Sequence, residues 1–560
     1  MKNNHGKITF KEYTMEQPML LPPRLDELIP DGHIVRIVND FIEAIDLSDL
    51  ITTYKGGGTS SYHPKMLLKV LVYAYTKKIY SSRMIAAGLR ENIHFMWLSG
   101  GNRPDFRTIN RFRGERLAET IQEVFAKLVL YLASRDYIDL SHYFTDGTKI
   151  EANANKHSYV WKKTTNRYQQ SVIDKVKDLF KEIDQLNEEE DHQYGDNDLP
   201  EVGEGKEINS EEIEAIAREL NKKLKAEDLK NDDNDASNVN EENEITSKEL
   251  EEMARKLNEK LKKTPKDKKT KKALNKLTRD YIPRLKKYEA YQKNFGQRNS
   301  FSKTDEDATF MRMKGDSMRM PILKPGYNVH IGTENQFIVG YSVHQNPSDS
   351  VGLIAHLEQV EKNLGALPGK IIADAGYGCE ENYDFLESKN LEAFVKYSGF
   401  DREQGKGKRK KPGPRSRYYA SNFTYDETTG DPICPEGKRL IYVETGKDTT
   451  NTGYTITKRF YRCEHGMTCP ARDLCTKAIN GRRSHEYSTR LMAYKKQVTE
   501  KLTSEEGRIL RSRRLIEPEA VFGLIKQNMN FRRFNLRGLK KVSAEWGLVS
   551  IAHNMIKMAA

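Results

Sequence analysis

The sequence predicts a multidomain α/β protein with a helical N-terminal domain, an α/β core and two insertions within that core. Three observations lead to this prediction. The chain has 560 residues, more than the roughly 250–300 at which a single hydrophobic core stops growing. Apolar residues recur at helical spacing from Leu25 to about Ala133, whereas strand-like and helical patterns alternate between Gly326 and Val395. The composition between these regions is strongly charged, which indicates a segment that buries little apolar surface.

These patterns divide the chain into six predicted segments. They are a helical N-terminal domain (1–135), the first part of the core (136–166), a charged helical or disordered insertion (167–300), the second part of the core (301–398), a cysteine-containing insertion (399–488), and a C-terminal helix with a basic helical tail (489–560). Helical patches are expected at 213–224 and 250–261 in the charged insertion. In the core we expect strands at 142–150, 327–333, 337–344, 370–374 and 392–396, and helical segments at 350–363, 382–386 and 491–526.

Basic residues outnumber acidic ones in the chain as a whole. Lysine and arginine total 93 against 81 acidic residues, which gives a formal net charge of +12 and a pI near 9.0. This balance favours a polyanionic partner, and nucleic acid is the first candidate. No run of about 18 apolar residues occurs and the N-terminus is polar, so we expect a cytoplasmic protein with no membrane partner.

A short basic helix is predicted within the N-terminal domain. Asp105 suits its start, and Ile109 marks its buried face. Arg107 and Arg111 point away from that face, while Arg113 lies nearer to it and has to reach outward along its stem. These three arginines are our candidates for DNA contact, because a basic helix face suits groove or phosphate binding. A solvated charged surface is the alternative.

Three acids are candidates for phosphodiester chemistry. Asp146 lies in the first predicted core strand and Asp374 ends a later one. Glu519 follows Pro518, which suits a first helical turn, and Lys526 is seven residues on, on the same helix face. Phosphodiester cleavage uses divalent ions, which such carboxylates hold. Each residue also has an ordinary interpretation, as a turn former, a helix cap or a surface charge.

Three segments together resemble the acid-bearing motifs of bacterial DDE insertion-sequence transposases: 145–154 (TDGTKIEANA), 373–378 (ADAGYG) and 519–526 (EAVFGLIK). Residues 61–64 (SYHP) and 107–113 (RTINRFR) are similar to the DNA-binding N-terminal domain that accompanies these cores. The resemblance implies a ribonuclease-H-like mixed sheet flanked by helices and a reaction dependent on Mg²⁺ or Mn²⁺. Water would free a 3′ hydroxyl at the element's end, and this hydroxyl would attack target DNA. The implied partner is double-stranded DNA, bound by a homodimer.

By this resemblance Asp146, Asp374 and Glu519 are the metal ligands, and Lys526 contacts the DNA backbone near the scissile phosphate. Related transposases carry the pattern Tyr-x2-Arg-x3-Glu-x6-Lys. This chain has Ser512 and Leu515 at its first two positions, and Arg511 and Arg514 lie one residue away. Arg514 is therefore a further candidate for DNA contact. Glu517 competes with Glu519 as the third acid.

Four of the five cysteines, Cys434, Cys463, Cys469 and Cys475, lie within one short segment. Four thiolates can close a tetrahedral site, so a structural Zn²⁺ is one interpretation. Free buried thiols are the other, and His465 is an alternative ligand.

The loop 406–417 is rich in lysine and arginine, so it is either a DNA contact or a solubilising linker. Two functions compete with that of an active transposase. They are a catalytically inactive DNA-binding repressor and a stand-alone ribonuclease-H-like nuclease.

Overall fold

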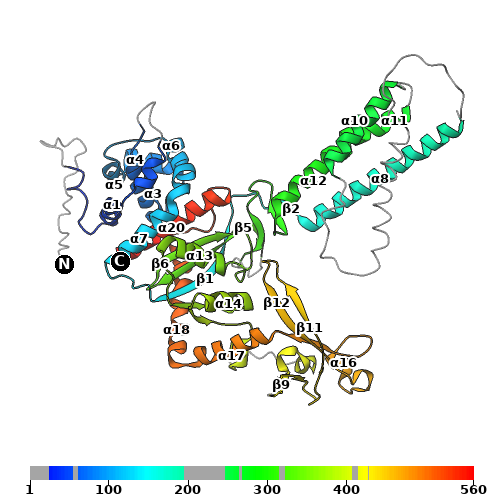
Figure 1. The fold of residues 1–560 in the computed structure, drawn as a ribbon. Helices are drawn as coiled ribbons and strands as arrows, with labels where there is room; N and C mark the ends of the chain where they lie inside the picture. The colour runs from blue at the N-terminus through cyan, green and yellow to red at the C-terminus, as the bar shows by residue number, and fades with distance from the viewer. Residues whose placement is uncertain are drawn as a thin grey trace, which may run out of the picture. The chain divides into compact units, whose positions relative to one another are not determined.

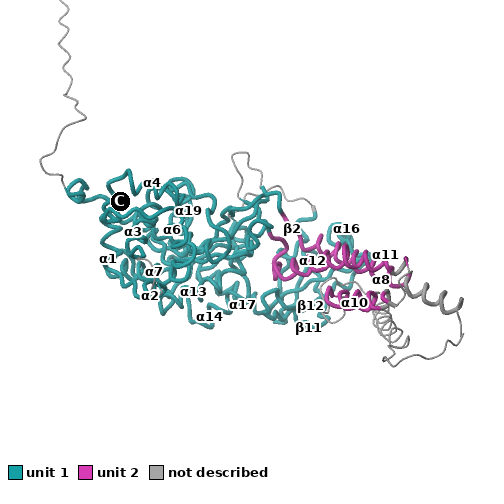
Figure 2. Tube along the Cα trace, turned by 90° about the horizontal axis from the view of Figure 1, so that it is seen from above, with its two compact units in different colours: residues 1–158, 302–560 teal, residues 159–301 magenta. Residues whose placement is uncertain are grey.

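The computed structural model describes residues 24–54, 61–193, 246–263, 268–313, 322–405, 414–426 and 428–560. The predicted helical patch at 213–224 and the basic stretch 406–413 lie outside the described residues. The chain forms two compact units, Met1–Ser158 with Ser302–Ala560, and Tyr159–Phe301 (Figure 2).

The N-terminal region is helical, as predicted. Its helices are α1 (Ile34–Ala44), α2 (Ser48–Thr52), α3 (Pro64–Thr76), α4 (Ser82–Glu91), α5 (Ile93–Ser99), α6 (Phe106–Arg111) and α7 (Leu117–Ser134), with the π turn η1 (Phe112–Arg116) between the last two. Asp105 starts α6 as expected, because its carboxylate accepts a hydrogen bond from the amide of Thr108 at 2.7 Å.

A six-stranded mixed sheet follows (Figure 1). Its strands are β1 (His142–Glu151), β4 (Thr309–Arg312), β5 (Leu323–Glu334), β6 (Phe337–His344), β7 (Lys370–Ala373) and β8 (Glu392–Val395). The order is β4-β5-β1-β7-β8, and β6 also pairs with β5. The contacts of β5 with β1, β4 and β6 are antiparallel, whereas β1, β7 and β8 run parallel. β1 is therefore the strand at which the sheet changes from antiparallel to parallel pairing.

Helices from the second half of the chain pack around this sheet. They are α13 (Leu353–Leu364), α14 (Glu380–Ser388), α17 (Thr489–Thr503), α18 (Glu505–Ile516), α19 (Pro518–Gly523) and α20 (Leu539–Met558), with the π turn η6 (Leu524–Asn528) directly after α19. The predicted helical stretch 491–526 is thus divided, and Ser504 caps α18 by accepting from the amide of Gly507. Helix α20 packs against α3, α7 and β6, so the N-terminal helices and the sheet share one hydrophobic core.

The cysteine-containing segment belongs to the same unit but has its own small core. It contains α15 (Phe400–Glu403), the 3-10 turns η3 (Pro414–Tyr418), η4 (Ala420–Asn422) and η5 (Gly466–Thr468), the helix α16 (Arg472–Cys475), and the strands β9 (Thr424–Tyr425), β10 (Pro432–Ile433), β11 (Ile441–Thr449), β12 (Thr455–Arg462) and β13 (Ser484–Tyr487). Phe423, Leu440 and Tyr461 are its buried apolar cluster. Most of the hairpin β11–β12 is exposed.

The second unit is a helical assembly. Its elements are β2 (Tyr159–Trp161), α8 (Lys162–Gln193), α10 (Ser247–Lys263), α11 (Lys268–Lys276), the π turn η2 (Leu277–Tyr281), α12 (Ile282–Phe295) and β3 (Ser300–Ser302), which pairs with β2. Val176, Leu250 and Leu285 lie in its core. Within the described parts of the chain, no helix is long and apolar enough to cross a membrane.

Candidate active site

Asp146 and Asp374 come from neighbouring parallel strands. In the pairing of β1 with β7, Phe144 lies beside Ile372. Extending this register by two residues puts Asp146 beside Asp374, in strands that lie about 4.8 Å apart. Because side chains two residues apart share a face of a strand, the two carboxylates are on the same side of the sheet.

The buried hydroxyl of Tyr377 lies near a third carboxylate, that of Asp349. Burial raises the pKa of Tyr377 well above its ordinary value, and the charges of Asp146, Asp349 and Asp374 raise it further. All three carboxylates are therefore within electrostatic reach of one hydroxyl. Asp349 was not among the residues singled out from the sequence.

Gly147 and Gly376, from the first two acid motifs, lie close to these carboxylates. A Cβ on Gly147 would lie 2.7 Å from Asp349 Oδ1, and one on Gly376 would lie 3.0 Å from Asp374 Oδ1 and 3.7 Å from Asp349 Oδ2. Asp349 Oδ1 accepts a hydrogen bond from Asn328 at 2.7 Å. A side chain at position 147 would therefore collide with Asp349, whereas one at position 376 would press only on the Asp374 carboxylate.

Hydrogen bonding keeps Asp349 charged. Burial alone would raise its pKa, but hydrogen bonds from His330 and Asn328 and the charge of Lys149 hold the pKa below its ordinary value. His330 Nε2 lies 3.5 Å from Asp349 Oδ1. Asp349 thus adds a carboxylate, rather than a neutral acid, to the pair from β1 and β7.

Glu519 lies on a later helix, and its connection to Asp146 runs through Arg514. Among the described residues, no three of the carboxylates Asp146, Asp374, Asp349 and Glu519 have oxygens within 4.8 Å of one another. The helical conformation is interrupted at Glu517, between α18 and α19. Pro518 is therefore the first residue of α19, and Glu519 lies in its first turn, as predicted. Arg514 Nη2 donates to Glu519 Oε1 at 2.7 Å, and its Nη1 lies 4.0 Å from Asp146 Oδ2. One guanidinium therefore connects the acid on α19 with the acid on β1.

The helix break also explains the departure from the family pattern. Leu515 stands at the usual position of the arginine and is 58% exposed. The side chain of Arg514 is only 13% exposed and faces the acids instead. Since α19 does not continue the turn of α18, the spacing between the arginine and Glu519 differs from that in an unbroken helix.

The competing acid Glu517 lies in a different environment. Its side chain is 4% exposed, and it accepts hydrogen bonds from the amide of Gln336 at 2.8 Å and from Arg513 at 3.4 Å. The side chain of Glu519 is 43% exposed. Glu517 joins α18 to the β5–β6 turn, and the more accessible acid is Glu519.

Lys526 lies beside the same strand. It belongs to the π turn η6, so the prediction that it shares a face with Glu519 by α-helical spacing does not follow. Its Nζ donates to Thr148 Oγ1 at 2.5 Å, two residues along β1 from Asp146. The ammonium group therefore lies at β1, beside the residue two positions after Asp146.

A second group of possible metal ligands lies at the start of β1. Asp139, His142 and Glu334 place ligand atoms within 4.8 Å of one another, the one such group of three among the residues that the structure describes. Burial raises the pKa of Glu334 to about 7, as does the hydrogen bond that its protonated carboxyl donates to Asp139. Asp139 accepts this bond and bonds from Ser141, which lower its pKa to about 2. These hydrogen bonds explain why the three side chains lie close together without a metal ion.

The donor set around Asp146 suits a divalent cation. Asp146, Asp374 and Glu519 offer the hard carboxylate oxygens that Mg²⁺ and Mn²⁺ bind, and Asp349 adds another. Two ions about 3.5–4 Å apart do not require all ligand atoms within one small sphere. The position of Arg514 between Asp146 and Glu519 means that the acids already attract a positive charge there.

The three arginines of the N-terminal candidate surface differ in exposure. Arg107 and Arg111 are exposed on α6. Arg113 is only 3% exposed, and its guanidinium donates to the Tyr75 hydroxyl at 3.0 Å and to the Tyr80 carbonyl at 2.7 Å. The π turn after α6 rotates Arg113 inward, so the prediction that it reaches DNA is not carried forward.

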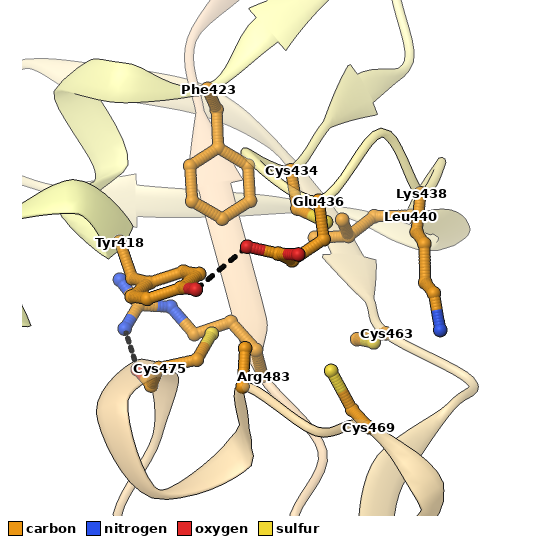
Figure 3. A pocket seen from close by; sticks show the side chains of 11 residues that line it. Tyr418, Phe423, Cys434, Glu436, Lys438, Leu440, Cys463, Cys469, Cys475 and Arg483 are labelled. Atoms are coloured by element: carbon orange, nitrogen blue, oxygen red, sulfur yellow. Dashed lines mark hydrogen bonds between the residues drawn. The ribbon is translucent and has the colours of Figure 1, made fainter.

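The four clustered cysteines line one small cavity (Figure 3). Cys434, Cys463, Cys469 and Cys475 are all half-buried and none forms a disulfide. His465, the alternative ligand, is not among the residues that line this cavity.

Two family models match the chain. Residues 433–559 match the model described as transposase DDE domain, and residues 23–115 match the model described as transposase domain (DUF772). The first match contains Glu519, Lys526 and the four clustered cysteines, and the second contains Arg107 and Arg111. The search of curated proteins gave no match.

Proposed function

Because these two matches identify the chain as a DDE-type insertion-sequence transposase, we propose that it cuts DNA at the ends of an insertion sequence and joins them to target DNA. The family implies DNA as the substrate and a divalent metal ion as the cofactor.

We assign the reaction to a ribonuclease-H-like core. The mixed sheet supports this assignment, with β1 antiparallel to β5 on one side and parallel to β7 on the other. Two acids at adjacent strands and one on a later helix are the arrangement that the motif resemblance implies.

Asp146, Asp374 and Glu519 are the proposed metal ligands. Bound Mg²⁺ or Mn²⁺ would activate the attacking oxygen and stabilise the leaving oxygen. Arg514 holds Asp146 and Glu519 toward each other, and it is positioned to turn to a DNA phosphate once another cation neutralises these acids. Lys526, beside Thr148, contributes a positive charge for the phosphate next to the scissile bond.

The same acids serve two chemical steps. In the first, a water molecule held at the carboxylates attacks the phosphodiester and leaves a 3′ hydroxyl at the element's end. In the second, that hydroxyl takes the place of the water and attacks a target phosphodiester, so that the new bond to phosphorus forms as the bond to the target strand's 3′ oxygen breaks. The residues on the protein side are unchanged between the steps, because both are displacements at phosphorus by an oxygen nucleophile.

The N-terminal helices are proposed to bind the element's ends. The exposed Arg107 and Arg111 on α6 offer phosphate or base contacts. Joining two ends at one target also leads us to propose a homodimer on DNA.

The proposal is supported by one observation, the ion pairs of Arg514 with Asp146 on β1 and Glu519 on α19, beside the parallel pairing of β1 with the strand that precedes Asp374. We would test it with the full chain, Mg²⁺ and DNA carrying the element's ends. Wild type is expected to cleave and join, while Asp374→Asn binds the same DNA but does neither. Asp40→Asn, an exposed position on α1, is the matched control and is expected to retain activity.

The other outcomes identify the competing functions. DNA binding without metal-dependent cleavage by the wild type would indicate a repressor. Cleavage without joining would indicate a nuclease.

A further inference from the structure

The cysteine-containing segment brings together four thiols from four separate turns. Cys434 opens a tight turn after β10, in which the amide of Gly437 donates to the Cys434 carbonyl at 2.8 Å. Cys463 directly follows β12, Cys469 follows η5, and Cys475 ends α16. No two of these cysteines are adjacent in sequence, so only the fold of the segment gathers them.

The cavity that they line is small. Its volume is about 20 Å³, close to that of one water-sized sphere. Figure 3 shows the four cysteine side chains arranged around this one space. A tetrahedral site of four thiolates holds a single ion at metal–sulfur distances of about 2.3 Å, which puts the sulfurs about 3.8 Å apart. No three of these four sulfurs lie within 4.8 Å of one another in the structure, so the cysteine side chains have to move inward when the ion binds. An iron–sulfur cluster would need more space than this cavity offers.

The charges beside the cavity suit a metal held by four thiolates. One Zn²⁺ and four thiolates together carry two negative charges, and two cations, Lys438 and Arg483, line the same cavity. Arg483 is fixed there, since its Nη1 donates to the carbonyl of Cys475 at 2.7 Å and its own carbonyl accepts from the amide of Cys463 at 2.8 Å. Glu436 also lines the cavity, but its carboxylate is engaged by the Tyr418 hydroxyl at 2.7 Å.

One buried hydrogen-bond donor of a residue that lines the cavity, Arg483 Nε, has no acceptor among the described residues. A buried donor left without a partner costs about 1–3 kcal/mol. A metal-bound thiolate is a strong acceptor, and charge-assisted bonds of this kind orient metal ligands.

The segment is also poor in apolar core. In the described residues its buried apolar cluster consists of Phe423, Leu440 and Tyr461, with Cys434, Cys463 and Tyr487 packed against it. Cores of this size rarely hold a small module together without a metal or disulfides. Since none of the cysteines is in a disulfide, a metal is the remaining cross-link of this type.

We infer that Cys434, Cys463, Cys469 and Cys475 bind one structural Zn²⁺ in tetrahedral geometry, with Arg483 neutralising and orienting the thiolates. Binding releases one proton from each thiol, and no redox change is involved. The ion holds η5, α16 and the turn after β10 against the hairpin β11–β12. This inference does not depend on the proposed transposase chemistry.

Metal analysis of the purified full chain tests the inference. One equivalent of zinc per chain is expected, and titration of the wild type with a mercurial thiol reagent should release it with the loss of four accessible thiolates. Cys463→Ser and Cys469→Ser should each lower the zinc content at least tenfold. Cys379→Ser is the matched control, because Cys379 lies outside the cavity, and it should keep the full equivalent.

Substitution of the zinc by Co²⁺ provides a measurement that does not depend on a variant folding. Absorption bands of tetrahedral cobalt with thiolate ligands are expected in the wild type. Protein purified without chelators that holds neither zinc nor Co²⁺ would overturn the inference, as would iron in place of zinc. Zinc that survives Cys463→Ser and Cys469→Ser unchanged would equally overturn it.

Discussion

Arg514 connects two acids from distant parts of the chain, since it donates to Glu519 at 2.7 Å while its other terminal nitrogen lies 4.0 Å from Asp146. The side chain is mostly buried, so this positive charge is poorly screened by solvent. Arg514 therefore competes with any cation that the two carboxylates bind.

This competition gives a first prediction, for Arg514→Met. Removing the guanidinium should lower the Mg²⁺ concentration needed for half-maximal DNA cleavage by roughly three- to tenfold, equivalent to about 0.7–1.4 kcal/mol. The measurement is a cleavage rate at a series of Mg²⁺ concentrations. Arg511→Met is the matched control, because Arg511 stacks on Phe400 at 5.3 Å, and its Mg²⁺ dependence should equal that of wild type. An unchanged Mg²⁺ requirement in Arg514→Met would contradict the competition.

Asp349 gives the second prediction. Its carboxylate shares the environment of Tyr377 with Asp146 and Asp374, and its lowered pKa keeps it charged at neutral pH. Asp349→Asn should therefore reduce the rate of cleavage at least tenfold, because it removes negative charge beside the proposed metal site while keeping the side-chain shape. DNA affinity, measured by gel shift without metal, should stay within twofold of wild type. Cleavage at the wild-type rate would show that Asp349 only stabilises the fold.

The contrast between Asp349 and Asp374 shows what the sequence could predict. Asp374 directly follows an apolar strand, so its position at a strand end follows from the sequence pattern, whereas the parallel pairing of β1 with β7 is a finding of the structure. Asp349 lies in a loop between β6 and α13, where no periodicity marks it. Only the packing of that loop against Gly147 and Gly376 gives it a place in the site.

Helix irregularities account for the other differences. A sequence pattern assumes unbroken α-helical spacing, whereas the break at Glu517 and the π turn that contains Lys526 alter which side chains share a face. For this reason the arginine that contacts Glu519 is Arg514, one residue before the position that the family pattern gives to an arginine. For a related reason Arg113, predicted to lie near the buried face and to reach outward along its stem, does not reach the surface, because η1 turns it into the core.

The third prediction concerns Gly147. A methyl group there would lie 2.7 Å from Asp349 Oδ1 and 3.0 Å from the His330 ring, and both are held in place by hydrogen bonds. Gly147→Ala should lower the free energy of unfolding by about 1–3 kcal/mol and abolish cleavage. Gly523→Ala is the contrasting variant, because it meets nothing within 4 Å on α19 and should stabilise the protein by up to about 1 kcal/mol. Chemical denaturation of both variants makes the comparison, and equal stability of the two would refute it.

The fourth prediction concerns pH and the pair Asp139–Glu334. Glu334 has a pKa of about 7 in the folded protein, above its ordinary value of 4.5, so its contribution to stability is present below pH 4.5 and is lost as the pH rises through 7. Glu334→Gln mimics the protonated acid and should remove this loss. The variant should gain on the order of 1–3 kcal/mol relative to wild type at pH 8 and nothing near pH 4.5. Unfolding measured at both pH values checks this, and an equal difference at the two would contradict the raised pKa.

The last prediction separates a structural arginine from surface arginines on neighbouring turns. Arg113 donates to Tyr75 and Tyr80 in the core, and Tyr75 in turn donates to the buried Glu545 on α20 at 3.3 Å. Arg113→Met removes the charge and its hydrogen bonds from this network, which should cost about 3–5 kcal/mol of stability. Arg111→Met removes an exposed charge and should change stability by less than about 0.5 kcal/mol.

If Arg111 contacts a phosphate, its loss should instead lower the slope of log affinity against log salt by about 1, for element ends and unrelated DNA alike. Thermal unfolding and salt-dependent DNA binding of the two variants give the answer. A stable Arg113→Met protein with weakened DNA binding would place Arg113 on the DNA surface after all, because a residue confined to the core cannot affect binding without affecting the fold.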